Sequence, residues 1–148
     1  MYDDDFIAEF INESKEQLST IIDDILKLEE CFAEVDNGLI NKIFRTIHSL
    51  KGASGFLGYD NMTEISHAFE TLLSKVRDNT LNLSSNLIDC FLGAVDLINI
   101  MLNNISNCRN VSVVKQVKLL ESFLDDKPPK TNKKLTTESL CEKIKNRI

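Results

Sequence analysis

The sequence predicts an all-α protein, an up-down antiparallel four-helix bundle with a fifth C-terminal helix. Apolar residues recur at intervals of three and four in five separate segments, which is the period of an amphipathic helix. Short polar stretches join the segments, which favours antiparallel neighbours. No segment alternates apolar and polar residues as a strand does, and a chain of 148 residues can bury a core without metal or disulfides.

The first two helices are expected over about 4–33 and 39–55, each with one apolar stripe. The first stripe contains Phe6, Ile7, Phe10, Ile11, Leu18, Ile21, Ile22, Ile25, Leu28 and Phe32. Acidic residues at 3–5 suit the positive end of that helix's dipole. Between the two helices, Asp36-Asn37-Gly38 predicts a turn.

The third helix is expected from Asn61 to near Asp78, because Asn61-x-x-Glu64 is similar to a capping box. Ser84 or Ser85 can cap the fourth helix, which extends to about residue 105. The apolar stripe of this fourth helix is wide, which indicates packing on more than one neighbour. The fifth helix is expected over about 111–125.

These helices define a domain over 1–125, and 126–148 is expected to be a linker or tail. The segment opens with Lys127-Pro128-Pro129-Lys130, a composition that cannot bury an apolar face. Residues 137–148 have the spacing of a short helix, which alone would be marginal in water.

Composition excludes several classes of function. A formal net charge of −6 argues against nucleic-acid binding, since phosphate backbones require clustered Lys and Arg. We expect no membrane insertion, because no run of about 18 apolar residues is present. The four cysteines form no C-x-x-C pair, and the acidic N-terminus does not have the form of a secretory signal. A cytoplasmic location with reduced thiols is therefore expected.

The candidate functional residue is His48, on the second expected helix. The stripe of Ile40, Ile43, Phe44, Ile47 and Leu50 places His48 about 80–100° from its centre, at the border between core and water. Lys51 lies one turn along the same side. Gly52 lies four residues on, where a side chain would stand over the imidazole. Glycine inside a helix costs about 1 kcal/mol relative to alanine, so we expect Gly52 to give a bulky group access to His48.

A histidine that accepts a phosphoryl group needs one ring nitrogen in solvent and an acceptor that holds the proton on the other. Glu70 flanks the apolar stripe of the third helix, about 120° from its centre, and is the best candidate for that acceptor. If Glu70 holds the Nδ1 proton, Nε2 is the nucleophile and is made more basic by the carboxylate. Lys51 is the nearby cation that would offset the phosphoryl charge.

The residues around His48 resemble the signature of the histidine phosphotransfer (HPt) family, in the run His48-x-x-Lys51-Gly52-Ala53-Ser54-x-x-x-Gly58. More narrowly, they resemble the N-terminal phosphoacceptor domain of the chemotaxis histidine kinase CheA. The downstream run His67-Ala68-Phe69-Glu70-Thr71-Leu72-Leu73 matches the next helix of that family, and the likeness covers about 6–123. The resemblance implies that Glu70 orients His48, and that Lys51 and an auxiliary His67 lie near the ring. The helical wheel alone points His67 almost opposite the apolar centre, so it enters the site by resemblance.

The resemblance also implies the partners. The ATP-binding domain of a histidine kinase would transfer the γ-phosphoryl group to Nε2 of His48, and an aspartate of a response-regulator receiver domain would then take it. ATP and Mg²⁺ would act on those partner domains, and no cofactor is expected in this chain. Nothing in the sequence resembles a P-loop. Within the family, the kinase domains would follow the 126–148 segment in a longer protein.

Three other interpretations remain open from the sequence. The chain could be a stand-alone HPt phosphorelay carrier, although the fifth helix and the linker favour the kinase-linked form. It could be a helical interaction module that does not use His48. A metal site formed by His48, His67 and Glu70 would need a fourth ligand, and bundle metal sites have Glu-x-x-His on inward faces rather than the His-x-x-Glu order found here.

Overall fold

The computed structural model describes residues 4–30 and 32–125, and that part of the chain is helical with no strand. The helices are α1 (Asp4–Leu28), α2 (Asn37–Leu57), α3 (Asp60–Arg77), α4 (Ser85–Asn103), the 3₁₀ helix η1 (Ile105–Asn110) and α5 (Val114–Asp125). The predicted all-α class is confirmed. The linker and short helix expected within 126–148 lie outside the described residues.

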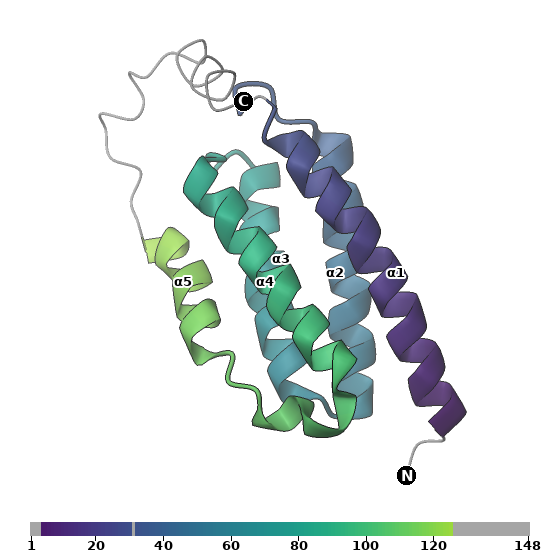
Figure 1. The fold of residues 1–148 in the computed structure, drawn as a ribbon. Coiled ribbons are helices and arrows are strands. Elements are labelled where there is room, and N and C mark those ends of the chain that lie inside the picture. Colours follow the sequence, from purple (N-terminus) through teal and green to yellow (C-terminus); the bar gives the residue numbers. More distant parts are fainter. Residues whose placement is uncertain (1–3, 31, 126–148) are drawn as a thin grey trace.

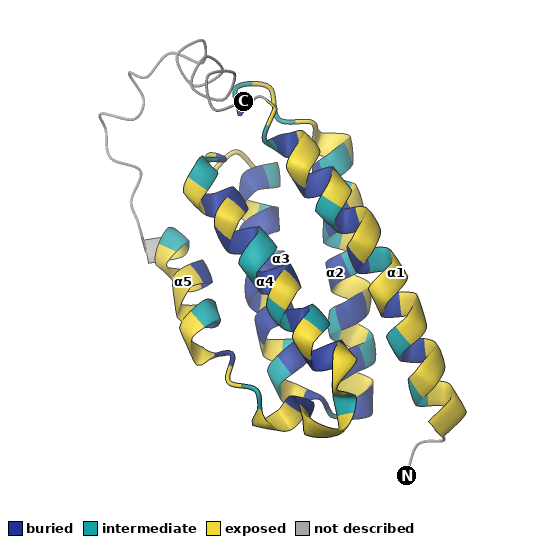
Figure 2. Ribbon diagram, viewed as in Figure 1, coloured by how far each residue is buried: buried dark blue, intermediate teal, exposed yellow. Residues whose placement is uncertain are grey.

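The four long helices form an up-down bundle, and α5 covers part of it (Figure 1). α2 packs most extensively on α3, α1 contacts both α2 and α4, and α5 lies against α3 and α4. The buried faces of the helices point toward a common core (Figure 2). At its centre the Phe69 and Phe91 rings stack with centroids 4.7 Å apart and join α3 to α4. Burial of a side chain of this size contributes about 1.5–3 kcal/mol.

The first helix ends earlier than the apolar stripe predicts. α1 stops at Leu28 rather than near residue 33. The chain then turns, with two hydrogen bonds between residues three apart: from Glu29 N to the Leu26 carbonyl and from Glu30 N to the Lys27 carbonyl, both 3.2 Å. Phe32 still reaches the core, with 8% of its surface exposed. The apolar spacing of α1 therefore extends past the end of the helix, because the following loop folds back onto the same core.

The helix that contains His48 is longer at both ends than expected. Asp36 is its N-cap rather than part of a turn, since Oδ1 accepts hydrogen bonds from the amides of Gly38 (2.9 Å) and Leu39 (3.2 Å). At the other end the helix continues through Gly55 to Leu57, and Gly58 is the C-cap with φ +81°. This left-handed conformation favours glycine, so the sharp turn into α3 requires Gly58.

The capping box expected at Asn61 is wrong. α3 begins at Asp60 after the N-cap residue Tyr59, and no side chain caps its first amides. Asn61 instead donates through Nδ2 to backbone carbonyls of the α4–α5 connection, those of Cys108 (3.3 Å), Arg109 (2.9 Å) and Val111 (2.8 Å). Tertiary hydrogen bonds have replaced the local one that the sequence suggested.

The fourth helix confirms two expectations. Ser84 is its N-cap, with Oγ accepting from the Leu87 amide at 3.1 Å. Its wide stripe contacts α1, α3, α5 and η1. Within the described residues, α4 is also the one helix whose length and composition would allow it to cross a membrane, although half of its most apolar stretch is buried inside the protein. That burial is the pattern of a core helix.

We expect Asn61→Ala to lower the free energy of unfolding by about 1–2 kcal/mol, because it leaves carbonyls of the α4–α5 connection without their donor. Urea denaturation followed by circular dichroism measures this change. Glu64→Ala is the matched control and should have almost no effect, since Glu64 caps nothing in the structure. A larger loss for Glu64→Ala than for Asn61→Ala would restore the capping box and contradict the tertiary role of Asn61.

Candidate functional site

His48 lies at the outer edge of α2. Its neighbours Ile47 and Leu50 are buried in the core, with 0% and 3% of their surfaces exposed. The helical period therefore turns His48 toward solvent, and 63% of its side chain is exposed. The ring is neither buried in the bundle nor free of it, because one edge rests against α3.

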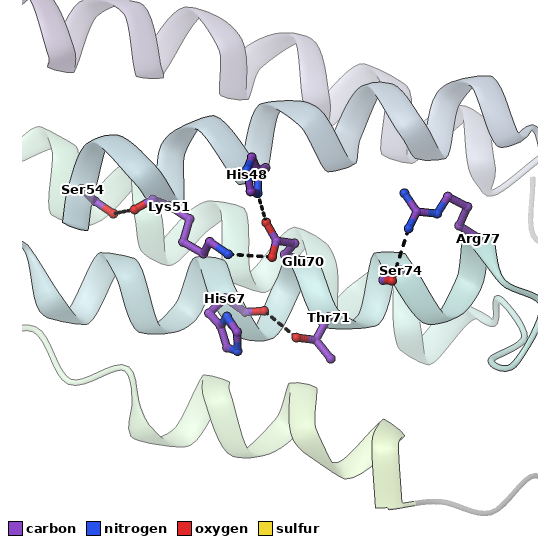
Figure 3. Close-up of polar contacts among 8 residues, drawn as sticks. All are labelled: His48, Lys51, Ser54, His67, Glu70, Thr71, Ser74 and Arg77. Carbon is purple, nitrogen blue, oxygen red and sulfur yellow. Dashed lines mark hydrogen bonds and ion pairs between the residues drawn. The ribbon is translucent and has the colours of Figure 1, made fainter. Parts of the chain in front are cut away.

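Glu70 on α3 makes the contacts that define the site. Its Oε2 lies 2.5 Å from Nδ1 of His48, and its Oε1 accepts a hydrogen bond of 2.8 Å from Nζ of Lys51 (Figure 3). The Glu70 side chain is only 13% exposed, whereas Lys51 is 25% exposed. The structure thus brings His48, Lys51 and Glu70 together, each carboxylate oxygen holding one partner on α2.

The charge of Glu70 determines which ring nitrogen of His48 is available. Burial alone would raise the pKa of the Glu70 carboxyl, but hydrogen bonds from Lys51 and His48, and the charges on both, outweigh burial and hold the pKa below its ordinary value. Glu70 is therefore a carboxylate at neutral pH and can only accept hydrogen bonds. The Nδ1 atom of His48 must then be the donor, so in the neutral ring Nε2 is a free nucleophile.

The register between α2 and α3 is fixed one to two turns beyond this contact. The hydroxyls of Ser54 and Thr63 lie 2.9 Å apart in a hydrogen bond, and Thr63 also donates to the Tyr59 carbonyl at 3.0 Å. Ser54 is fully buried. Because this bond joins Ser54 of α2 to Thr63 of α3, it favours the alignment of the two helices in which the hydroxyls meet. That alignment sets Glu70 opposite His48.

Neither packing nor backbone conformation requires a glycine at position 52. A Cβ atom built at Gly52 would meet no atom within 4 Å, and its φ is not positive. Gly52 is exposed on the face of α2 that presents His48. The helix thus accepts a residue that weakens it by about 1 kcal/mol without any packing benefit.

The structure does not bring His67 into contact with the ring of His48. His67 is exposed on α3, and its ring points toward α5 and away from His48 (Figure 3). No hydrogen bond or ion pair joins its side chain to another described residue; only its backbone carbonyl accepts from Thr71 Oγ1 at 2.9 Å. His67 and Lys51 do line one open groove of about 550 Å³ between α3 and α5. His67 thus shares a surface with Lys51, and His48 is not among the residues that line it.

Two residues near His48 were not predicted from the sequence. Phe44 belongs to the apolar stripe of α2, but its half-buried ring also stacks on the imidazole of His48, with centroids 6.0 Å apart and planes 7° apart. The guanidinium of Arg77, at the end of α3, lies over Phe44 with Cζ 4.8 Å from the ring centroid. The i, i+4 spacing of Phe44 and His48 could have revealed the first contact. No local signal could have revealed Arg77.

Metal binding finds no support at this site. Across residues 4–30 and 32–125, no group of three or more His, Cys, Asp or Glu side chains is arranged to hold a metal ion. His48 and Glu70 are joined directly at 2.5 Å, which leaves no room for an ion between them.

Comparison with known proteins gives one consistent family. Residues 5–108 match the family model described as Hpt domain. Chemotaxis protein CheA of Listeria monocytogenes is 31% identical over 132 residues, which is 87% of this chain and 20% of that protein. The chain thus spans about a fifth of the length of this curated relative.

Two solved structures are similar in fold. The CheA phosphotransferase domain from Thermotoga maritima has a TM-score of 0.64 and 34% identity, and the match covers 69% of this chain and 95% of that one. The phosphorylated P1 domain of CheA3, in complex with CheY6 from R. sphaeroides, has a TM-score of 0.72 and 20% identity, covering 85% and 100%. At 20% identity the second match supports the fold alone.

The lowered pKa of Glu70 predicts a pH dependence of stability. A carboxyl whose pKa is lower in the folded state contributes stability above its unfolded pKa of about 4.5, and this contribution is lost as the pH falls through the folded value. We expect Glu70→Gln to lower the free energy of unfolding by about 1–2 kcal/mol at pH 7, with the difference from wild type shrinking below about pH 4.5.

Urea denaturation between about pH 3 and pH 7 measures this difference. Glu64→Gln, an exposed change on the same helix, should give a curve parallel to wild type. A Glu70→Gln curve that also stayed parallel to wild type would contradict the ionic pairing of Glu70.

Proposed function

The chain belongs to the Hpt domain family, and from this membership we propose that it is the phosphoacceptor domain of a chemotaxis-type histidine kinase system, with His48 as the residue that is phosphorylated. The supporting observation is the imidazole itself. It is 63% exposed, and its Nδ1 is held by a carboxylate. The exposed Nε2 is thus the nitrogen that a donor can reach.

In the proposed first step, Nε2 of His48 attacks the γ-phosphorus of ATP held by a kinase ATP-binding domain. An N–P bond forms, and the P–O bond to the departing ADP breaks. No proton leaves Nδ1, so the phosphorylated ring is formally an imidazolium. The Glu70 carboxylate, already bonded to Nδ1 at 2.5 Å, is placed to stabilise that positive charge.

Lys51 is proposed to offset the charge of the phosphoryl group. Its Nζ is bonded to Glu70 on the α2–α3 face, and a quarter of its side chain is exposed, so the ammonium can turn toward a group on His48. In the second step a receiver-domain aspartate attacks phosphorus, the N–P bond breaks, and its electron pair returns to Nε2. We propose a response regulator as this partner, and the P1 domain of CheA3, which has the same fold, is itself found in complex with CheY6.

The domain itself is proposed to supply position and a docking surface, while ATP and Mg²⁺ act on the partner domains. The relatives are about five times as long as this chain, which supports a kinase ATP-binding domain elsewhere in the system. We also place the reaction in the cytoplasm, where ATP is available and where buried thiols such as Cys90 and Cys108 remain reduced.

Incubation with labelled ATP and the ATP-binding domain of a CheA relative tests the assignment. Wild type should acquire label that survives base and is lost in acid, as an N–P bond requires, and His48→Gln should acquire none. His67→Gln is the matched control, because His67 is the second of only two histidines, and it should keep its label. Wild-type labelling of His48→Gln would refute the assignment.

Gly52 provides a second test, because we propose that it leaves clearance for the docking domains. Gly52→Leu should fold at least as stably as wild type, since helix propensity favours leucine by about 0.5–1 kcal/mol. It should nevertheless slow phosphorylation at least tenfold through steric exclusion. Urea denaturation and the labelling assay separate the two effects.

Asn86→Leu, an exposed change on α4, is the control and should leave the rate of phosphorylation unchanged. A normal rate in Gly52→Leu would remove the clearance argument.

A further inference from the structure

We propose that Phe44 and Arg77 are positioning residues for His48, with Phe44 fixing the plane of the imidazole and Arg77 holding the Phe44 ring in place. The inference rests on the proposed function of His48 and adds two residues to it. Neither residue touches the reacting atoms. Each would act through the orientation of the ring that Glu70 already anchors.

A second constraint on His48 is needed because the bond to Glu70 fixes only one atom of the ring. The side chain is 63% exposed, so the core does not hold it. The torsion that turns an imidazole about its Cβ–Cγ bond is broad. With Nδ1 bonded to Glu70 Oε2, the ring can still tilt through coupled rotations about the Cα–Cβ and Cβ–Cγ bonds, and the direction of the Nε2 lone pair changes with the tilt.

The Phe44 ring supplies that constraint. It lies one turn before His48 on α2, and the two rings are offset and nearly parallel, with centroids 6.0 Å and planes 7° apart. This separation falls within the range of favourable aromatic pairs. Phe44 is half-buried and packed against the core, so it is itself more firmly held than the histidine. A swing of the imidazole would lose this contact.

Arg77 holds Phe44 from α3, so the stack also crosses between helices. Its guanidinium carbon lies 4.8 Å from the Phe44 centroid, a cation–π geometry. The guanidinium has two further contacts: Nη2 donates to Ser74 Oγ at 3.5 Å, a contact drawn in Figure 3, and Nε lies 3.8 Å from Asp78 Oδ1. The contacts run in one series from Asp78 and Ser74 through Arg77 and Phe44 to His48.

α3 thus reaches His48 by two routes. Glu70 holds Nδ1 directly, and Arg77 holds the ring plane through Phe44. The contact with Glu70 determines which ring nitrogen is free, and the contact through Phe44 determines the direction in which that nitrogen points. A near-attack geometry depends on both, because a misdirected lone pair lowers the rate even when the tautomer is correct.

The test compares Phe44→Leu, which keeps an apolar side chain but removes the ring, with Phe44→Tyr, which keeps the ring. Three-bond couplings of the two His48 Hβ protons, to Hα across Cα–Cβ and to Cδ2 and Nδ1 across Cβ–Cγ, are measured by NMR and report whether the ring holds one orientation. We expect averaged couplings and phosphorylation by kinase domain and ATP slowed about two- to tenfold in Phe44→Leu. Phe44→Tyr should restore single-rotamer couplings and a rate within about twofold of wild type.

Arg77→Met tests the outer contact without disturbing the core, and Lys75→Met is its control, since Lys75 is exposed and in the same last turn of α3. Arg77→Met should give averaged His48 couplings and slower phosphorylation, as Phe44→Leu does. Lys75→Met should behave as wild type in both measurements. An equal loss in both methionine variants would show a general effect of charge at the helix end and would overturn the role of Arg77.

Wild-type couplings in Phe44→Leu would overturn the proposal, as would averaged couplings with an unchanged rate of phosphorylation. The coupling measurement needs no kinase. If wild type accepted no phosphoryl group, that result would contradict the proposed function of His48. The couplings would still decide whether Phe44 and Arg77 hold the ring.

Discussion

The Glu70 carboxylate, shared between His48 and Lys51, is the interaction on which the rest of the site depends. One oxygen fixes the imidazole and the other fixes the ammonium, at 2.5 and 2.8 Å. Both partners come from α2, while the carboxylate comes from α3, so the site exists only when the two helices pack in one register. The Ser54–Thr63 hydrogen bond maintains that register. The packing of α2 on α3 thereby determines the tautomer of the exposed His48 ring.

The sequence was sufficient for the parts of the structure that follow from helical periodicity. The stripe through Ile47 and Leu50 correctly turns His48 to the edge of α2, and the wheel of α3 points His67 away from the core. Ser84, one of the two serines expected to cap α4, is its N-cap, and its hydrogen bond reaches only three residues ahead. In each case the information is local, since the side chain and its environment are related by the geometry of a single helix.

The features that the sequence did not predict depend on contacts between distant segments. Asn61 satisfies carbonyls some fifty residues away rather than its own helix end. α1 ends at Leu28 although Phe32 remains in the apolar stripe, because a loop can bury a residue as well as a helix can. Arg77 reaches the neighbourhood of His48 only through the packing of α3 on α2. Spacing along one helix contains no information about such pairs.

The central claim, that a carboxylate on α3 holds the proton on Nδ1 and leaves Nε2 free, can be tested directly by the ¹⁵N shifts of the His48 ring in long-range ¹H–¹⁵N spectra of the unphosphorylated protein. At a pH where the ring is neutral, the account predicts a protonated Nδ1 and an unprotonated Nε2, with that preference lost in Glu70→Ala. A ring with its proton on Nε2, or a tautomer ratio unchanged by removal of the carboxylate, would contradict it.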